Sequence, residues 1–153
     1  MLRASAVCEE AGVPSSSLVS QGFLKLAEAS SIGLGLPSMP VALVPGHPGA
    51  QSAAMLRRNI LEVTAAEVIK NLTDATGTGA QSTEPQAQDV VFKGDQVFAA
   101  LEDSLKATYP GVNFVHWSVL GNTHGPDERQ ILADLPRRLK ELKADAVISG
   151  MGC

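Results

Sequence analysis

The sequence predicts an α/β fold, a three-layer sandwich with a mostly parallel sheet of the Rossmann-like or flavodoxin-like type. Three observations predict this class. Short apolar runs alternate with amphipathic helical patterns along the 153 residues. The run at 41–44 is continuously apolar, which is typical of a strand covered on both faces. The runs are separated by helix-length segments, which favours parallel pairing through right-handed crossovers.

The first half of the chain, residues 1–72, contains two predicted strands and three predicted helices. A helix is expected at 2–11, ended by Gly12, and a short serine-rich strand passes through Leu18 and Val19. The second helix runs from about 22 to 32 and is broken by Gly33, Gly35 and Pro37. Its inward-facing residues are expected to be Phe23, Leu26, Ala27 and Ser30.

The strand at 41–44 leads into the turn Pro45-Gly46-His47-Pro48-Gly49 and then into a long helix, roughly 52–72. That helix is expected to bury one stripe, formed by Leu61, Ala65, Val68 and Leu72. Residues 73–87 have no apolar period and are interpreted as a linker.

The second half, residues 88–153, repeats the α/β rhythm, so the halves are predicted to form one domain together or two half-domains. We expect a strand at 90–92, a helix at 95–108 and a strand at 112–120 that contains His116. A helix at 126–143 comes next, kinked or divided into two by Pro136, and the last strand is 146–149. The inward residues of the two helices are expected to be Val97, Leu101, Leu105, Ile131, Leu135, Leu139 and Leu142.

Composition excludes several classes of function. The net charge is −4 and the chain has no basic run, which argues against nucleic acid as a partner. No apolar run has membrane-spanning length, and the first residues do not form a signal peptide. Two cysteines far apart in sequence do not form a disulfide framework, so a reducing cytoplasm is the expected location.

Three candidate catalytic or binding residues each come after a predicted strand: His47, His124 and Cys153. If the strands are parallel, all three lie at the carboxyl rim of the sheet, where ligands bind in open α/β folds. Gly150 and Gly152 permit a sharp turn and close approach to a ligand. Asn122 adds hydrogen-bonding groups to the loop of His124.

Each candidate has a structural alternative. Cys153 is either a thiolate nucleophile or redox thiol, or a small residue at a frayed chain end. His124 is either an acid–base partner or a surface histidine, and the latter is more common. His47 either helps hold an anion at the helix that starts near Ser52 or forms a structural turn. The three residues could also form a metal site, which no close ligand pair supports, and Cys8 is expected to be buried.

Several segments resemble the UGSC-like (seleno)protein family, in permuted order. The stretch 144–152, Ala-Asp-Ala-Val-Ile-Ser-Gly-Met-Gly, resembles the strand and turn before the family's redox motif, Sec or Cys followed by Gly-Ser-Cys. The stretch 9–14, Glu-Glu-Ala-Gly-Val-Pro, resembles the end of the helix after that motif. Phe23 with its helix, Gly35-Leu36-Pro37 and the turn 44–48, Val-Pro-Gly-His-Pro, resemble the segments further downstream in the family. This downstream block is also similar to the selenoprotein B subunit of glycine, sarcosine and betaine reductases.

The order of these segments departs from the family pattern, and the redox motif itself is missing. Three explanations remain open: a circular permutation, a subunit of a hetero-oligomer, or a reading frame bounded by selenocysteine codons. The last is the favoured expectation, and it predicts a TGA codon directly after Cys153 and another upstream of Met1. Any other stop codon after Cys153 would refute it.

The resemblance implies a selenol- or thiol-based redox or reductive-cleavage protein that acts on a small molecule. It implies selenocysteine in the full-length protein, no other cofactor, a protein thiol reductant as partner and a homo- or hetero-oligomer. Cys153 would then be the surviving thiol, with His124 and His47 as neighbours. The alternative is a non-catalytic subunit or an α/β module that binds a small anion.

Overall fold

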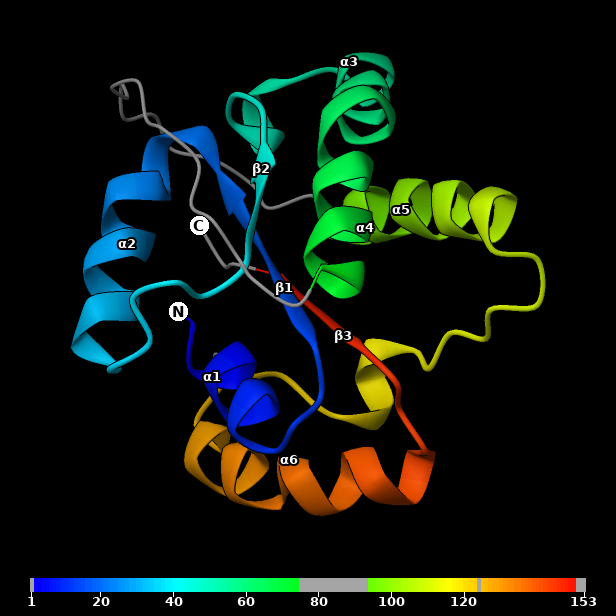
Figure 1. The fold of residues 1–153 in the computed structure, drawn as a ribbon. Coiled ribbons are helices and arrows are strands. Elements are labelled where there is room, and N and C mark those ends of the chain that lie inside the picture. Colours follow the sequence, from blue (N-terminus) through cyan, green and yellow to red (C-terminus); the bar gives the residue numbers. More distant parts are fainter. Residues whose placement is uncertain (1, 75–93, 124, 151–153) are drawn as a thin grey trace.

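The computed structural model describes residues 2–74, 94–123 and 125–150. Three strands, β1 (Ser15–Ser20), β2 (Val41–Val44) and β3 (Val147–Gly150), form a parallel sheet in the order β2-β1-β3. β1 is the central strand, and all six of its residues are buried. The predicted α/β class with a parallel sheet is confirmed. The sheet joins strands from both ends of the chain (Figure 1).

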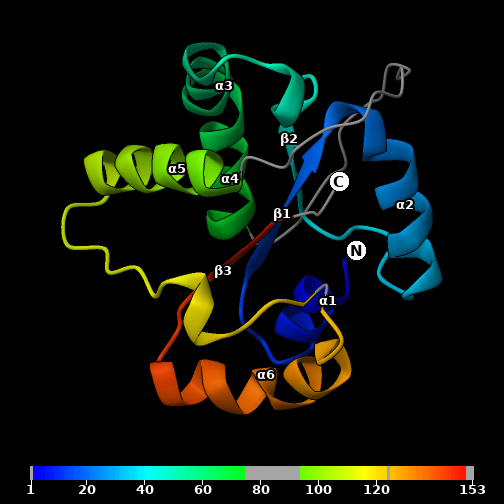
Figure 2. The ribbon, with the colours of Figure 1, turned by 180° about the vertical axis from the view of Figure 1, so that it is seen from behind.

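Helices cover both faces of this sheet, as the predicted three-layer arrangement requires (Figures 1 and 2). They are α1 (Arg3–Glu10), α2 (Leu24–Gly33), α3 (Ala53–Asn59), α4 (Ala65–Thr73), α5 (Gly94–Thr108) and α6 (Glu128–Leu142). Short 3₁₀ turns lie at Gln21–Phe23, Pro48–Ala50 and Trp117–Val119. Helices α3, α4 and α5 pack on one face, and α1, α2 and α6 pack on the other.

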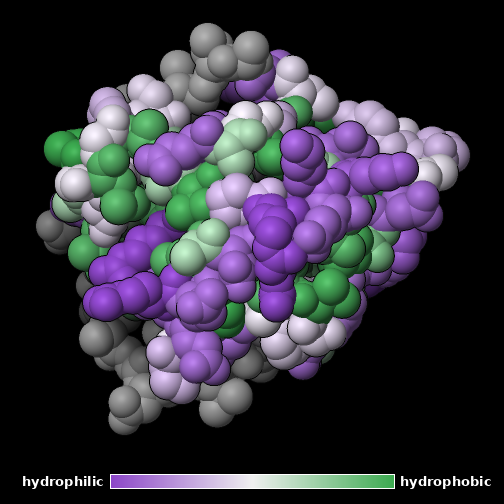
Figure 3. Space-filling view, turned by 90° about the horizontal axis from the view of Figure 1, so that it is seen from below, coloured by the Kyte–Doolittle hydropathy of each residue, from purple (hydrophilic) through white to green (hydrophobic). Residues whose placement is uncertain are grey.

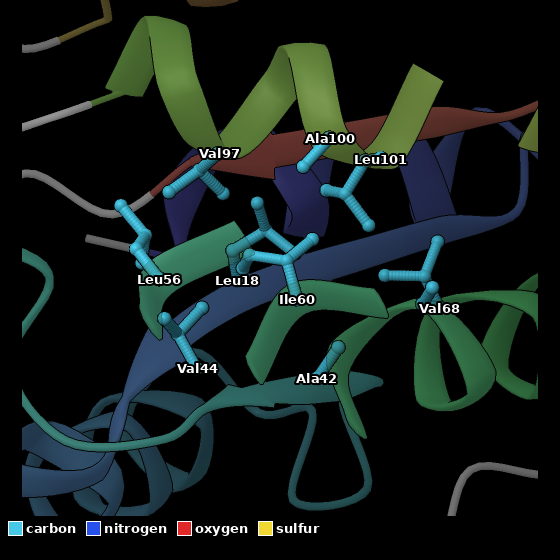
Figure 4. Close-up of a cluster of buried hydrophobic side chains, with 10 residues drawn as sticks. Leu18, Ala42, Val44, Leu56, Ile60, Val68, Val97, Ala100 and Leu101 are labelled. Atoms are coloured by element: carbon cyan, nitrogen blue, oxygen red, sulfur yellow. The ribbon is translucent and has the colours of Figure 1, made fainter. Parts of the chain in front are cut away.

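The larger core lies on the face of α3, α4 and α5 (Figure 4). Leu18 of β1 and Val44 of β2 point into it from the sheet. They meet side chains from both halves of the chain: Leu56, Ile60, Ala65 and Val68 from the first half, and Val97, Ala100 and Leu101 from α5. The opposite face has two smaller clusters, one between α1, α2 and the sheet, the other between α1 and α6.

The predicted helix at 52–72 is interrupted by a π-helical segment, Ile60–Thr64, between α3 and α4. A π turn holds one more residue than an α turn, so it shifts the buried stripe by one position. Ile60 is therefore fully buried, whereas Leu61, which was predicted to face inward, is 39% exposed. Ala65 and Val68 are buried as predicted.

Side chains from this helical run also occupy the outer edge of β2. The backbone N–H of Ser17 donates to the carbonyl of Pro40, so even-numbered residues of β2 face β1 and Leu43 faces outward. The N–H of Leu43 donates to Glu67 Oε2, and its carbonyl accepts from Thr64 Oγ1 at 2.7 Å. Both outward backbone groups of Leu43 are thus engaged.

The predicted strand at 112–120 is wrong. Four of its apolar side chains, Val112, Val115, Trp117 and Val119, are between 38% and 51% exposed, and His116 caps a 3₁₀ turn. The local hydrogen bonds explain this. His116 Nδ1 accepts from the N–H of Ser118, and Arg138 of α6 donates to the carbonyls of Val119 and Leu120. These contacts engage backbone groups that a strand would need for pairing.

Two smaller predictions about the helices are also corrected. Leu26 of α2 is 47% exposed, because the helix turns Leu24, Ala27 and Ser31 inward instead. Helix α6 continues through Pro136 as a single helix and buries Leu135 and Leu139.

Seen from below, the surface of the molecule is mostly hydrophilic along the middle, with groups of hydrophobic atoms to either side (Figure 3).

The remaining predictions are confirmed or fall outside the described residues. The helix at 95–108 and the last strand are confirmed as α5 and β3. The predicted strand at 90–92 and most of the linker at 73–87 lie outside the described residues. Within the described ranges, no helix combines the length and the apolar character needed to cross a bilayer.

Candidate functional site

The three parallel strands place their carboxyl ends at one rim of the sheet. β1 ends at Ser20, β2 at Val44 and β3 at Gly150. His47 lies three residues after β2, and Gly150 is the last residue of β3. Both belong to strand ends of this rim, as predicted. Gly152, Cys153 and His124 lie outside the described residues.

His47 has a structural role in its turn. Its Nδ1 accepts from the N–H of Gly49 at 3.2 Å and so caps the 3₁₀ turn Pro48–Ala50. With Nδ1 as acceptor, the proton of the neutral ring is on Nε2, which can donate to another group. The nearby helix α3 is capped by Ser52, whose Oγ accepts from the N–H of Met55. An anion at that helix start, one of the two possibilities considered for His47, is therefore not needed to satisfy the N–H of Met55.

Three amide side chains hold the loop between β2 and α3, and sequence reasoning missed them. Gln21 Oε1 accepts from the N–H of Gly46 at 3.1 Å, where φ is +67°. Gln51 Nε2 donates to the carbonyl of Pro45 at 2.6 Å, and Gln51 Oε1 accepts from Asn59 Nδ2 at 2.6 Å. The loop that carries His47 is thus fixed to the end of β1 and to α3.

The absence of a side chain at Gly150 leaves room for the ring of Phe98. A Cβ at this position would lie 3.1 Å from Cζ of Phe98, which belongs to α5. The glycine therefore allows α5 to pack closely on the carboxyl end of β3. Its predicted approach to a ligand stays a prediction.

Asn122 lies in the loop before α6, and its carbonyl accepts from the N–H of Gly125 at 3.2 Å. Because 112–120 is not a strand, Asn122 does not follow a strand end, and the prediction that its loop lies at the carboxyl rim is wrong on this point. Next to this loop is an open hollow of about 590 Å³ between the starts of α1 and α6. It is lined by Arg3, Gly125, Pro126, Glu128, Arg129 and Leu132.

The carboxyl end of β3 is joined to the first turn of α1 by three serine hydroxyls. Ser5 Oγ of α1 is 2.6 Å from Ser17 Oγ of β1 and 2.6 Å from Ser149 Oγ of β3. Ser149 Oγ is 3.3 Å from Ser17 Oγ and completes a triangle. Ser5 and Ser17 are fully buried. We call these three residues the serine ring.

The last turn of α1 is fixed in a similar way. Glu9 Oε1 accepts from the N–H of Ser15 at 2.7 Å and from Ser15 Oγ at 2.8 Å. Polar contacts thus hold both ends of α1 against the sheet. Sequence reasoning noted the serine-rich strand but did not assign these roles; the run Ser15-Ser16-Ser17 beside Leu18 and Val19 was the available signal.

Cys8 is the buried thiol of the described residues, as predicted. It is fully buried between α1 and α6, in the cluster that contains Leu135 and Leu139. Burial raises the pKa of the Cys8 thiol to about 11, and the charge of Glu9 contributes in the same direction. Cys8 is thus protonated at neutral pH and is not a nucleophile.

The described residues contain no group of three His, Cys, Asp or Glu side chains that could hold a metal ion. The remaining polar groups near the start of α1 are an ion pair between Arg3 Nη1 and Glu128 Oε1, at 3.1 Å, and the amides of the first turn. The residue at the N-cap of α1, Leu2, makes no side-chain capping hydrogen bond. These amides are suited to an anionic group.

Comparison with known proteins finds a family that part of the chain resembles. Residues 1–74, which include α1, β1, α2, β2, α3 and α4, match the UGSC family. No curated protein and no solved structure matches the chain. The match covers the segment in which the stretch 9–14 and the turn 44–48 led to the same family. Residues 1–74 of this chain are thus similar to the UGSC family.

Proposed function

We propose that this protein is a thiol- or selenol-based redox protein that acts on a small molecule in the cytoplasm. One observation supports this proposal most directly. The 2.6 Å contact between Ser5 and Ser149 brings the carboxyl end of β3 to the first turn of α1. A reactive group that comes directly after β3 would then lie near a helix N-terminus.

Such a location favours the reactive form of a thiol or selenol. The N-terminus of a helix carries a partial positive charge and free amide donors, and it lowers the pKa of a nearby thiol. Cys153 is three residues beyond Gly150, so chain geometry limits its Cα to about 11 Å from that of Gly150. We propose Cys153 as the thiol, with His124 and the Nε2 of His47 as candidate neighbours.

The proposed reaction has three steps that balance. The thiolate or selenolate attacks an electrophilic carbon of the substrate, and the leaving group departs with its electron pair. A thiolate of a partner dithiol protein then attacks the bound sulfur or selenium, and the carbon leaves with the bonding pair and takes up a proton. The product is reduced by two electrons, and a mixed disulfide or selenenylsulfide joins the two proteins. The second thiol of the partner then attacks that bond, releases the thiolate or selenolate, and leaves the partner as a disulfide.

The pH dependence of the alkylation rate of Cys153 tests this proposal. The experiment uses the Cys8→Ala variant, in which Cys153 is the single thiol. We expect the rate to rise with an apparent pKa clearly below the value of about 8.5 for a free cysteine. Replacement His124→Ala should raise that pKa. An ordinary pKa that His124→Ala leaves unchanged would contradict the proposal.

A second function, binding of a small anion without catalysis, is favoured by the hollow between α1 and α6. Two guanidinium groups, Arg3 and Arg129, line it. Arg129→Ala should then weaken the binding of acetate or inorganic phosphate measured by calorimetry, whereas Arg57→Ala on α3 should not. Equal binding by the two variants would exclude this hollow as the site.

A further inference from the structure

We propose that the serine ring, Ser5, Ser17 and Ser149, is the element that positions the end of β3 against α1. The inference rests on the proposed function, because the reactive group is taken to come directly after β3. In this view the three serines are positioning residues. They fix how far the carboxyl end of β3 lies from the first turn of α1.

The hydroxyl protons account for all three contacts of the ring. Each serine has one hydroxyl proton and can donate one hydrogen bond. Three contacts among three hydroxyls can form together only if each serine donates to the next in one direction around the ring. Removal of any one hydroxyl therefore removes two of the three hydrogen bonds. The two remaining hydroxyls keep a single bond between them.

Because of where the ring lies, loss of its hydrogen bonds affects the contacts among α1, β1 and β3. Ser5 is in the first turn of α1, Ser17 is in the central strand, and Ser149 is the residue before the end of β3. Apolar contacts are non-directional, so they would allow a helix to slide along the sheet. Hydrogen bonds between buried groups fix both distance and direction.

The other face of β1 provides a comparison. Ser16 is as buried as Ser17, but its side chain lies on the opposite face, where its Oγ accepts from Asn71 Nδ2 of α4 at 3.0 Å. This bond joins β1 to α4 and involves no side chain of α1 or β3. Its loss removes a buried hydrogen bond of the same kind but leaves the position of β3 relative to α1 unchanged.

The test uses the isosteric pair Ser149→Thr and Ser149→Val in the Cys8→Ala background. Both variants add a methyl group that a strand accommodates, and only threonine keeps the hydroxyl. The readout is the alkylation rate of Cys153 from acidic to alkaline pH. We expect the Val variant to react about two- to fivefold more slowly at neutral pH, as loss of a helix-terminus interaction implies, and the Thr variant to match the parent.

Two further variants keep the test decisive. Ser5→Ala breaks the ring from α1 and should slow Cys153 as Ser149→Val does; it replaces the Val variant if circular dichroism shows that Val unfolds the chain. Ser16→Ala should leave the rate unchanged. An unchanged rate in both ring variants would overturn the inference and leave the proposed function intact. A parent protein with the pH profile of a free cysteine would overturn both.

Discussion

The two faces of the central strand differ in what its serines bind. Toward α3, α4 and α5, Leu18 enters the larger aliphatic core, and Ser16 makes one hydrogen bond, to α4. We call this side the apolar face. Toward α1, Val19 is also buried, but Ser15 and Ser17 join the strand to both ends of α1 and to β3. Aliphatic burial supplies free energy on both sides, and the hydroxyls toward α1 supply a defined position for α1 and β3.

Aliphatic burial and the hydroxyl network therefore have different effects: the first mainly sets the free energy of unfolding, and the second sets the position of α1 relative to β3. A core of Leu, Ile and Val loses free energy when a side chain is truncated, but its contacts permit many similar arrangements. A hydroxyl network contributes less free energy, yet it has few arrangements that satisfy all of its members. We therefore expect changes on the two faces to have different consequences.

The largest expected effect is on the apolar face. Ile60→Ala removes a fully buried side chain of the π-helical segment and should lower the free energy of unfolding by about 2–5 kcal/mol. The adjacent change Leu61→Ala is the control, because Leu61 is 39% exposed and should cost less than about 1 kcal/mol. Urea denaturation measures both. Equal losses would mean that the π-helical segment does not turn Ile60 inward in solution.

The next effect concerns Cys8, on the side of α1 that faces α6. Its pKa is raised to about 11 in the folded protein, so between about pH 9 and 11 the unfolded chain ionises first. Ionisation of the unfolded chain favours unfolding, so stability should fall as pH rises through this window, by up to about 3 kcal/mol.

Comparison with Cys8→Ala isolates this contribution, because other groups that titrate in the same range are common to both proteins. At pH 8 the wild type should be the more stable protein, and by pH 11 its advantage should be reduced or reversed. Urea denaturation under reducing conditions gives both values. A stability difference that is independent of pH would show that Cys8 titrates equally in the folded and unfolded states.

The smallest expected effect is on surface ion pairs, one on each side of the sheet. Arg57 Nη2 lies 2.9 Å from Asp103 Oδ2 between α3 and α5, and Arg3 pairs with Glu128 between α1 and α6. Both arginine side chains are more than half exposed, so Arg57→Ala and Arg3→Ala should each cost less than about 1 kcal/mol. High salt should reduce the difference from wild type. A larger loss for Arg3→Ala would show that α1 depends on charge more than on its buried hydroxyls.

Sequence reasoning predicted the elements whose burial is strong and local. The run 41–44 is continuously apolar and is β2, and Val97, Leu101 and Leu105 at helical spacing are buried in α5. It failed where hydrogen bonds from side chains to the backbone determine the local structure. The apolar-rich segment 112–120 lacks a strand partner among the described residues, and the side chains of His116 and Arg138 bind its backbone instead.

The candidate site was predicted in outline. Parallel strands placed His47 and Gly150 at strand ends of the same rim, and this holds. The serine ring and the Gln51 contacts were not predicted, because they join residues far apart in sequence through single hydrogen bonds. Such bonds leave no periodic signal. The π-helical segment was also missed. Its one-residue shift leaves the composition of the helix unchanged, so both Ile60 and Leu61 were compatible with the buried stripe.

The hydrogen bonds at the outer edge of β2 determine where another strand could join this sheet. Exposed sheet edges promote unwanted association with other chains, and proteins protect them in several ways. Here Thr64 and Glu67 bind the carbonyl and the N–H of Leu43 that an incoming strand would need. A strand that joined this side would have to displace both hydrogen bonds. A strand that paired with β3 instead would lie next to Ser149 of the serine ring, so extension of the sheet and placement of the site would be coupled.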